Sequence, residues 1–345
     1  VIQSSLRDGK LRFLHIDDVS EELGDVVVIA TGTPPSVNGA ADLSQVRSAL
    51  RWLKDKVRQG AVVVMKSTVP PGAGMGFVEI ELASTGIRYV SNPEFLREGH
   101  AIYDWFHPDR IVIGANDAES VEVGRDLHLG IDAPMLVTDI TSAELIKYAS
   151  NAFLATKISF INEIASLCDI VGASIDDVSN GVAMDTRIGS ASMRAGVGYG
   201  GSCFPKDVRA LDYLALTNGH NFELLRSAIT VNNRQRLLPL HALRERFGRL
   251  SGMKVAVLGL SFKPGTGDMR EAPSVDLIQA RVAANADIST CAPVVSTPAL
   301  AGLTENVRIC SDLLEAVEGA HAVVVMTEWN EIVSADWDAV TQSME

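Results

Sequence analysis

A cysteine, a lysine and an aspartate lie close together in the stretch "GVGYGGSCFPKD", which runs from Gly196 to Asp207. The glycines leave backbone N–H groups able to approach a ligand, and Lys206, three residues after Cys203, favours the thiolate form of a nearby thiol. A cysteine without such neighbours is most often a small buried hydrophobe. The stretch therefore raises three interpretations: a nucleophile in a glycine-rich cradle, a metal or disulfide cysteine, or a dinucleotide-binding loop.

The glycine spacing of this stretch matches G-x-G-x-x-G at Gly196, Gly198 and Gly201. A dinucleotide fingerprint needs a strand before it and an acidic residue about 20 residues after it, and neither is present. The four cysteines are widely spaced, with no C-x-x-C pair and no histidine cluster nearby, which argues against a disulfide scaffold or a zinc site. We therefore expect the glycines to bring the backbone close to a substrate and to leave Cys203 exposed to it.

Two further pairs of polar residues have a spacing that suits a site. Lys147 and Asn151 are four residues apart in a helical region, so they share one face of the helix. Glu94 and Glu98 bracket "EFLRE" in a loop that follows a strand. Taken alone, the lysine would be a solvated surface residue and the two carboxylates would face solvent.

Five other polar residues are candidates for a site. Thr33 and Thr68 follow strands, and as isolated threonines they would cap a helix. Asp207 would position a water molecule or cap the helix that follows it. Lys263 and Arg270 flank the glycine turn in "KPGTGDMR", where basic residues taken alone are commonly solvated.

These residues must be positioned by α/β elements. Residues 25 to 114 alternate β-branched runs with helix-capable segments, a pattern typical of a parallel α/β sheet covered on both faces. Ligands are expected at the carboxyl ends of such strands. Residues 139 to 182 show helical periodicity, with a predicted break at Gly172.

A glycine-rich loop over residues 183 to 204 and a second helical region over 206 to 248 follow. At Met253 a new α/β unit opens, with further strands at "ADISTC" and "HAVVVMTEW". The fold class is α/β, with two Rossmann-like parallel-sheet domains joined by a long central helical domain. The predicted domains cover residues 1–138, 139–250 and 251–345.

The composition limits the partners. The chain has 345 residues, 47% of them hydrophobic, and a formal net charge of −13, with no long basic block, which argues against nucleic acid. Apolar runs such as "VAVLGL" are far shorter than the ~20 residues of a membrane helix, so we expect a soluble protein. The cysteine usage and the lack of a cleavable apolar segment at the start favour the cytoplasm.

Seven stretches together resemble the UDP-glucose/GDP-mannose dehydrogenase family. They are "GTPP", "KSTVPPG", "SNPEFLREG", "ELIKYASNAFLATKISFINEI", "RIG", "GVGYGGSCFPKD" and "VAVLGLSFKPGTGDMREAPS", and they occur in the family's order over nearly the whole chain. "SCFPKD" and "KSTVPPG" are most similar to the UDP-glucose 6-dehydrogenase branch. The resemblance implies NAD as cofactor and two-step oxidation of UDP-glucose to UDP-glucuronate, with GDP-mannose or a UDP-N-acetylhexosamine as alternative substrates.

The resemblance also implies residue roles. Cys203 would trap the aldehyde as a thiohemiacetal that becomes a thioester. Arg187 would reach the substrate of a neighbouring subunit, which predicts a homodimer. Lys263 would contact the sugar nucleotide and Arg270 would contact NAD, which predicts a site between the two α/β domains. The catalytic set would be Cys203, Lys147, Asn151, Asp207, Glu94 and Thr68. NAD would contact Thr33, Thr68, Glu98, Lys206 and Arg270. The substrate would contact Glu94, Phe95, Leu96, Arg97, Lys147, Asn151, Arg187, Gly196, Gly200 and Lys263.

The family pattern normally begins with a strand, a G-x-G-x-x-G turn and a ribose-binding acid, and this chain starts after them. Without that turn, a pyrophosphate has no helix N-terminus to meet. A second hypothesis, of a different class, is therefore a truncated module that binds sugar nucleotide or dimerises without oxidising its ligand.

Overall fold

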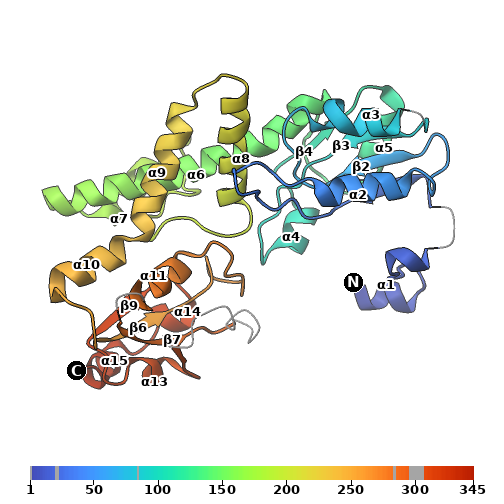
Figure 1. The fold of residues 1–345 in the computed structure, drawn as a ribbon. Coiled ribbons are helices and arrows are strands. Elements are labelled where there is room, and N and C mark those ends of the chain that lie inside the picture. The colour runs from blue at the N-terminus through green and yellow to red at the C-terminus, as the bar shows by residue number, and fades with distance from the viewer. Residues whose placement is uncertain (1, 20–22, 84, 283–284, 295–306) are drawn as a thin grey trace. The chain divides into compact units, whose positions relative to one another are not determined.

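The computed structural model describes residues 2–19, 23–83, 85–282, 285–294 and 307–345 (Figure 1). The chain divides into two compact units. The first comprises Val1–Thr33, Leu43–Glu94 and Pro108–Glu144, and the second comprises Pro34–Asp42, Phe95–His107 and Leu145–Glu345. The three domain boundaries given above stay a prediction.

The first unit is built on a five-stranded sheet whose strands follow one another in chain order. Two short helices, α1 (Ile2–Arg7) and η1 (Ile16–Asp18), precede it. The strands are β1 (Val26–Ile29), β2 (Val62–Met65), β3 (Arg88–Ser91), β4 (Ile111–Gly114) and β5 (Met135–Thr138). All residues of β2 and β4 are buried, as expected for strands covered on both faces.

One pairing in this sheet differs from the parallel arrangement that we predicted. The pairs β1–β2, β2–β3 and β4–β5 are parallel, whereas β3 and β4 meet antiparallel at Ser91 and Gly114. A parallel neighbour needs a crossover that packs on the sheet. The helix between these strands, α4 (Ala101–Phe106), belongs to the second unit, so it provides no such crossover.

Helices cover both faces of this sheet (Figure 1). Side chains alternate along β2, so Val63 and Met65 pack in one cluster with α2, while Val62 and Val64 pack in another that α5 covers. The helical elements of this unit are α2 (Ser44–Leu53), the π-helical turn η2 (Gly74–Val78), α3 (Glu79–Leu82) and α5 (Ala118–Asp126).

A long helix, α6 (Ile140–Val171), begins in the first unit and continues in the second. The predicted break at Gly172 is confirmed, because the helix ends at Val171 and Gly172 has a φ of 75°. Glycine adopts this left-handed conformation without a steric cost, which makes it a common helix stop. Helix α7 (Ile175–Ala183) is capped by Ser174, whose side chain accepts a hydrogen bond from the N–H of Asp177.

The rest of the second unit continues with helices α8 to α10 and a four-stranded sheet of order β8-β7-β6-β9, parallel throughout. The predicted strands at "ADISTC" and "HAVVVMTEW" are confirmed as β7 and β9. The helices are α8 (Phe204–Thr217), α9 (Glu223–Arg236) and α10 (Leu238–Phe247). The strands are β6 (Lys254–Leu258), β7 (Asp287–Cys291), β8 (Val307–Ile309) and β9 (Ala322–Val325).

Both faces of this second sheet are also covered. Val255 and Val257 of β6 pack with α10 and α11, while Ala256 and Leu258 pack with α13, α14 and α15. These covering helices are α11 (Pro273–Val282), α13 (Leu313–Val317), α14 (Asn330–Val333) and α15 (Trp337–Ser343). The first turn of α11 follows the glycine turn that carries Lys263 and Arg270.

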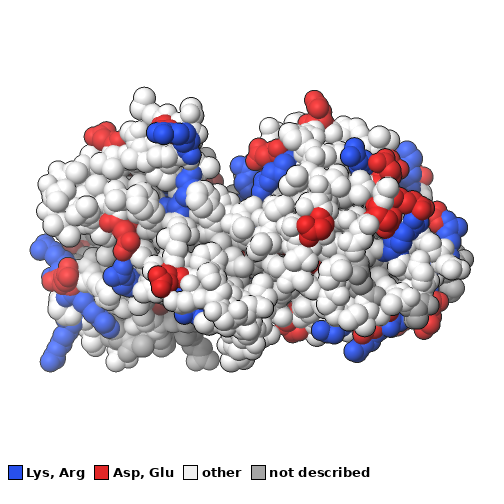
Figure 2. Space-filling view, turned by 90° about the horizontal axis from the view of Figure 1, so that it is seen from above, with Lys and Arg blue, Asp and Glu red and all other residues white. Residues whose placement is uncertain are grey.

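Figure 2 shows basic and acidic side chains interspersed over the visible face, separated by uncharged residues. No helix among the described residues is long and apolar enough to cross a membrane. Within the same described ranges, no three His, Cys, Asp or Glu side chains form a group that could hold a metal ion.

Candidate active site

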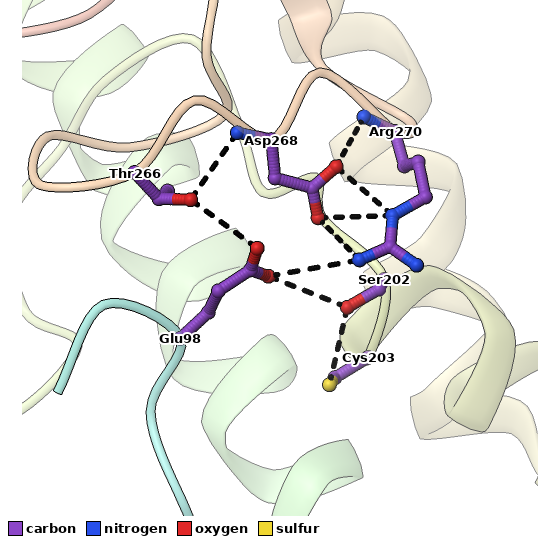
Figure 3. Close-up of polar contacts among 6 residues, drawn as sticks. All are labelled: Glu98, Ser202, Cys203, Thr266, Asp268 and Arg270. Carbon is purple, nitrogen blue, oxygen red and sulfur yellow. Dashed lines mark hydrogen bonds and ion pairs between the residues drawn. The ribbon is translucent and has the colours of Figure 1, made fainter. Parts of the chain in front are cut away.

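Cys203 lies at the amino end of α8, where it occupies the position just before the first helical residue. Its side chain is half-buried, and its Sγ is 3.6 Å from the Oγ of Ser202 (Figure 3). The first N–H groups of a helix have no partner within the helix and carry partial positive charge. The helix therefore presents polar donors beside the residue that we predict to be the nucleophile.

The loop that carries Cys203 is held by buried amide side chains. Asn162 of α6 accepts a hydrogen bond from the N–H of Gly196 at 2.8 Å, and Gln235 of α9 donates to the carbonyl of Gly196 at 2.7 Å. The Oδ1 of Asn232 accepts from the N–H of Tyr199 at 2.7 Å. The loop runs from α7 to α8 with no strand before it, which confirms that its G-x-G-x-x-G spacing is not a dinucleotide fingerprint.

Asp207 lies one turn into α8 and is 1% exposed. Its carboxylate accepts a hydrogen bond from the Nδ2 of Asn151 at 2.6 Å and one from the Nζ of Lys206 at 2.5 Å. The alternative helix-capping role of Asp207 is wrong, because Cys203 occupies the capping position. The ammonium of Lys206 is bound to this carboxylate, so half-buried Lys206 and buried Asp207 form an ion pair in the first turn of α8.

Lys147 and Asn151 lie one turn apart on α6, and both side chains are buried. The solvated lysine that we considered is therefore excluded, since Lys147 is only 4% exposed. Its Nζ lies 5.4 Å from the centre of the Phe95 ring. A buried ammonium and a buried amide on one helix face can both donate hydrogen bonds to a substrate oxygen.

Glu98 lies in a cluster of polar side chains from three segments of the second unit (Figure 3). Its carboxylate accepts from the Oγ1 of Thr266 at 3.2 Å and from the Oγ of Ser202 at 3.5 Å, and the Nη2 of Arg270 is 4.0 Å away. Burial raises the pKa of Glu98, and the neighbouring carboxyl of Asp268 raises it further.

The pKa of Asp268 is shifted in the opposite direction from the pKa of Glu98. Burial opposes ionisation of its carboxyl, but hydrogen bonds from the side chain and backbone of Arg270 lower the pKa of Asp268 overall. When the two carboxyl groups share one proton, that proton therefore resides mainly on Glu98. This places a carboxyl that can hold a proton beside Ser202, the neighbour of the thiol.

Each arginine that we predict to bind a ligand has a carboxylate partner within the chain. Arg270 binds Asp268 through Nη2 at 2.8 Å and Nε at 2.9 Å. Arg97 binds Asp104 at 2.6 Å, and exposed Arg187 binds Asp185 at 2.6 Å. A phosphate that approaches these guanidinium groups would share or replace an existing carboxylate partner.

The remaining substrate-contact candidates of the second unit differ in exposure. Burial lowers the pKa of Lys263, while Glu98 and Asp104 raise it and Arg97 lowers it. Its Nζ lies 5.6 Å from the centre of the Phe262 ring. Phe95 and Leu96 are half-buried, and Gly200 is buried.

Three predicted residues belong to the first unit. Thr33, Thr68 and Glu94 follow β1, β2 and β3, which are parallel neighbours, so all three lie beyond the carboxyl edge of one sheet. Thr33 is buried, and Thr68 and Glu94 are half-buried. A cofactor hydroxyl or phosphate commonly binds at this edge of an α/β sheet. The position of the site between the two α/β domains stays a prediction.

This edge offers an observation that fits a bound nucleotide. The Oγ1 of Thr31 is buried and has no hydrogen-bond partner among the described residues. The Oγ of neighbouring Ser67 instead donates to the carbonyl of Thr31 at 2.7 Å. A buried hydroxyl without a partner costs free energy, and a ligand group can satisfy it.

The sequence interpretation missed four residues of the second unit, namely Ser202, Thr266, Asp268 and Glu271. Asp268 and Thr266 lie inside the turn "KPGTGDMRE", between the two basic residues that were singled out. A signal existed, since a carboxylate two residues before an arginine can bind it as a fork, as Asp185 also does with Arg187. Ser202 and Glu271 carried no comparable signal.

The two sheets covered by helices on both faces define an α/β protein. Cys203 lies at a helix amino end, and Lys147, Asn151 and Asp207 are buried. Three sequence models match in order: the NAD binding domain over residues 1–132, the central domain over 141–234 and the UDP binding domain over 256–345. All three models describe one family. The chain belongs to the UDP-glucose/GDP-mannose dehydrogenase family.

Similar proteins agree with this assignment. A UDP-glucose 6-dehydrogenase of Bacillus subtilis (strain 168) is 44% identical over 100% of this chain and 79% of its own length. The solved UDP-glucose dehydrogenase of Pyrobaculum islandicum is 37% identical, covers 97% of this chain and 79% of its own, and has a TM-score of 0.92. A UDP-N-acetylmannosamine dehydrogenase of Pyrococcus horikoshii is 26% identical, covers 100% and 80%, and has a TM-score of 0.86.

Proposed function

We propose that this protein oxidises UDP-glucose to UDP-glucuronate in two NAD-dependent steps, through a covalent intermediate on Cys203. The observation that carries the proposal is the position of Cys203 at the amino end of α8, near the buried pair of Asn151 and Asp207. The similarity to UDP-glucose dehydrogenases from two organisms supports the choice of substrate.

The covalent chemistry follows from the thiol. After the primary alcohol has become an aldehyde, the sulfur of Cys203 bonds to the aldehyde carbon, and the carbonyl oxygen takes up the electron pair and a proton to give a thiohemiacetal. Loss of a hydride and a proton from this species gives a thioester. Water then adds to the thioester, the carbon–sulfur bond breaks, and the thiol and a carboxylate are released.

The buried polar residues stabilise these steps. Lys147 and Asn151 donate to the oxygen on which negative charge develops, and Asp207 holds the amide of Asn151 in place. Glu94 acts as the base for the water that cleaves the thioester. When bound, NAD accepts one hydride in each of the two oxidations.

Cofactor contacts are proposed from Thr33, Thr68, Glu98, Lys206 and Arg270. The unpartnered hydroxyl of Thr31 at the carboxyl edge of the first sheet fits a nucleotide there. The sugar nucleotide would be held by Phe95, Leu96, Arg97, Arg187, Gly196, Gly200 and Lys263, together with Glu94, Lys147 and Asn151. An exposed arginine that already forms a fork with a carboxylate is preorganised to present its remaining donors to a phosphate.

We also propose a homodimer and a cytoplasmic location. Phe153, Phe160 and Leu167 are spaced seven residues apart on α6, which puts them on one face, and each is more than half exposed. A second copy of this chain is the partner that we propose for this face. All four cysteines are free thiols in the structure, which supports a reducing compartment.

The substrate can be tested with purified protein, NAD and a panel of UDP-glucose, GDP-mannose and UDP-N-acetylhexosamines. We expect NADH absorbance to rise with UDP-glucose, with two NADH formed for each UDP-glucuronate detected by mass spectrometry. Turnover of another sugar nucleotide without turnover of UDP-glucose would overturn the proposed substrate. Binding of sugar nucleotides without any NADH formation would instead support a non-oxidising module.

A further inference from the structure

Glu271 has a backbone conformation that disfavours its residue type. Its φ is 52°, in the left-handed region, and only Ser192 and Asn285 share this feature among the described non-glycine residues. Glycine or asparagine adopts this conformation more readily than a long side chain does. A glutamate at such a position indicates that its side chain has a function that offsets the unfavourable backbone conformation.

The side chain of Glu271 is held by arginines from two helices. Arg209 of α8 donates to its Oε1 at 2.7 Å, and the Nη1 of Arg236 at the end of α9 is 3.5 Å from its Oε2. Arg236 is buried and also donates to the backbone carbonyl of Glu271 at 2.9 Å. Burial opposes ionisation, but these two arginines lower the pKa of Glu271, so the carboxylate is charged near neutral pH.

The backbone beside Glu271 contacts the loop that carries the thiol. The N–H of Gly201 donates to the carbonyl of Arg270 at 2.9 Å. Gly200 approaches so closely that a Cβ there would overlap the carbonyl oxygen of Glu271 and lie 3.0 Å from its carbonyl carbon. Two consecutive glycines of the thiol loop are therefore packed directly against the backbone of residues 270 and 271.

We propose that Glu271 is a positioning residue for Cys203. We call the contacts of its carboxylate with Arg209 and Arg236 the clasp. The clasp fixes the backbone of residues 270–272 against Gly200 and Gly201. This contact sets the place of the thiol relative to Arg270. The inference rests on the proposed covalent role of Cys203 and adds a residue that touches no substrate atom in that mechanism.

Two explanations of Glu271 predict opposite effects of one substitution. If only the shape of the turn matters, Glu271→Gly removes the backbone strain and leaves the thiol loop unchanged. If the clasp matters, the same substitution releases the turn, because glycine has no side chain for the two arginines to hold. Since glycine is favoured at this φ, the variant should fold, which keeps the test informative.

The test compares the full-length protein with Glu271→Gly, Glu271→Gln and Arg209→Gln. Asn285→Gly is the matched control, because Asn285 has a similar φ of 55° and lies outside the site. We expect faster amide hydrogen exchange in residues 198–203 of Glu271→Gly and an altered rate of Cys203 alkylation by iodoacetamide. We also expect kcat for UDP-glucose to fall about tenfold while KM changes less than about threefold.

The Gln and Arg209 variants should lie between Glu271→Gly and the unaltered protein in exchange and kcat, because each keeps part of the clasp. Hydrogen exchange, alkylation and kcat of Glu271→Gly that match those of Asn285→Gly would overturn the proposal. An unaltered protein that fails to oxidise UDP-glucose would contradict the proposed function alone. The exchange and alkylation rates would still test the clasp in that case.

Discussion

The carboxylate of Asp207 is the most enclosed charged group near the thiol, and its two partners account for its burial. An ionised carboxylate that is 1% exposed needs donors on both oxygens, and Asn151 and Lys206 supply one each. The ion pair of Lys206 and Asp207 holds the amide of Asn151 in place, so this amide presents its remaining N–H donor in a fixed direction. The proposed contact of Lys206 with NAD would therefore share its ammonium with Asp207.

At the residue scale, the sharpest prediction concerns the thiol. Cys203→Ser should lower the rate of UDP-glucuronate formation by about a thousandfold or more, because a serine hydroxyl is a far weaker nucleophile than a thiolate near neutral pH. The measurement is steady-state NADH formation with product mass spectrometry. Cys291→Ser is the control, since Cys291 is a free, half-buried thiol at the end of β7 and should leave the rate unchanged.

Retention of the full rate by Cys203→Ser would remove the covalent mechanism. Accumulation of the aldehyde by the variant would support it, because the first oxidation does not need the sulfur.

The sequence predicted only some of the polar and charged side chains that face the candidate site. Sequence spacing correctly placed Lys147 and Asn151 on one helix face. It did not predict that Lys206 binds Asp207, because a one-residue separation does not fix the directions of two side chains. The local fork of Asp268 with Arg270 had a sequence signal, but the effect of Asp268 on Glu98 had none, because it depends on a contact between residues far apart in the chain.

At the scale of elements, the segment after β2 is anchored by the first turns of α6. The two oxygens of buried Glu144 accept hydrogen bonds from the N–H groups of Gly72 at 2.7 Å and Gly74 at 2.8 Å. Burial raises the pKa of Glu144 to about 7, although these N–H donors oppose the shift. The anchored segment directly follows Thr68, so Glu144 fixes the loop that we propose to contact NAD.

Gly74→Ala tests how tightly this loop is packed. An added Cβ would lie 2.7 Å from Cε1 of Tyr89 and 2.9 Å from Oε1 of Glu144, so we expect the free energy of unfolding to fall by about 1–3 kcal/mol. Gly76→Ala, in the same π-helical turn, meets no atom within 4 Å and should be neutral or slightly stabilising. Chemical denaturation measures both, and equal effects would contradict the packing described here.

Strands and long helices were predictable where the pattern was strong. The apolar runs at β1 to β4, β6, β7 and β9 predicted strands, and Gly172 predicted the end of α6. Strand β5 was missed, because its edge position leaves Leu136 and Val137 exposed and removes the signal of a buried run. The antiparallel β3–β4 pair was also missed, since the direction of a strand depends on where its connection packs.

For the whole molecule, the apolar face of α6 carries a prediction about assembly. Phe160→Glu should convert the proposed dimer to monomer, because a charge at the centre of an apolar interface must be desolvated without a partner. Leu129→Glu is the control, since Leu129 is an exposed leucine of the first unit and is not part of α6. Light scattering after size-exclusion chromatography gives the mass. A Phe160→Glu variant that stays dimeric would show that the dimer interface does not lie on this face of α6.

The chain passes between the two units five times, because Pro34–Asp42 and Phe95–His107 belong to the second unit although their flanking residues belong to the first. During synthesis, these two short pieces leave the ribosome well before Leu145–Glu345, the residues that complete their unit. Domains that are continuous in sequence can fold one after another as they emerge. Both units of this chain are discontinuous, so we expect a nascent chain stalled before Leu145 to expose both pieces to chaperones and proteases.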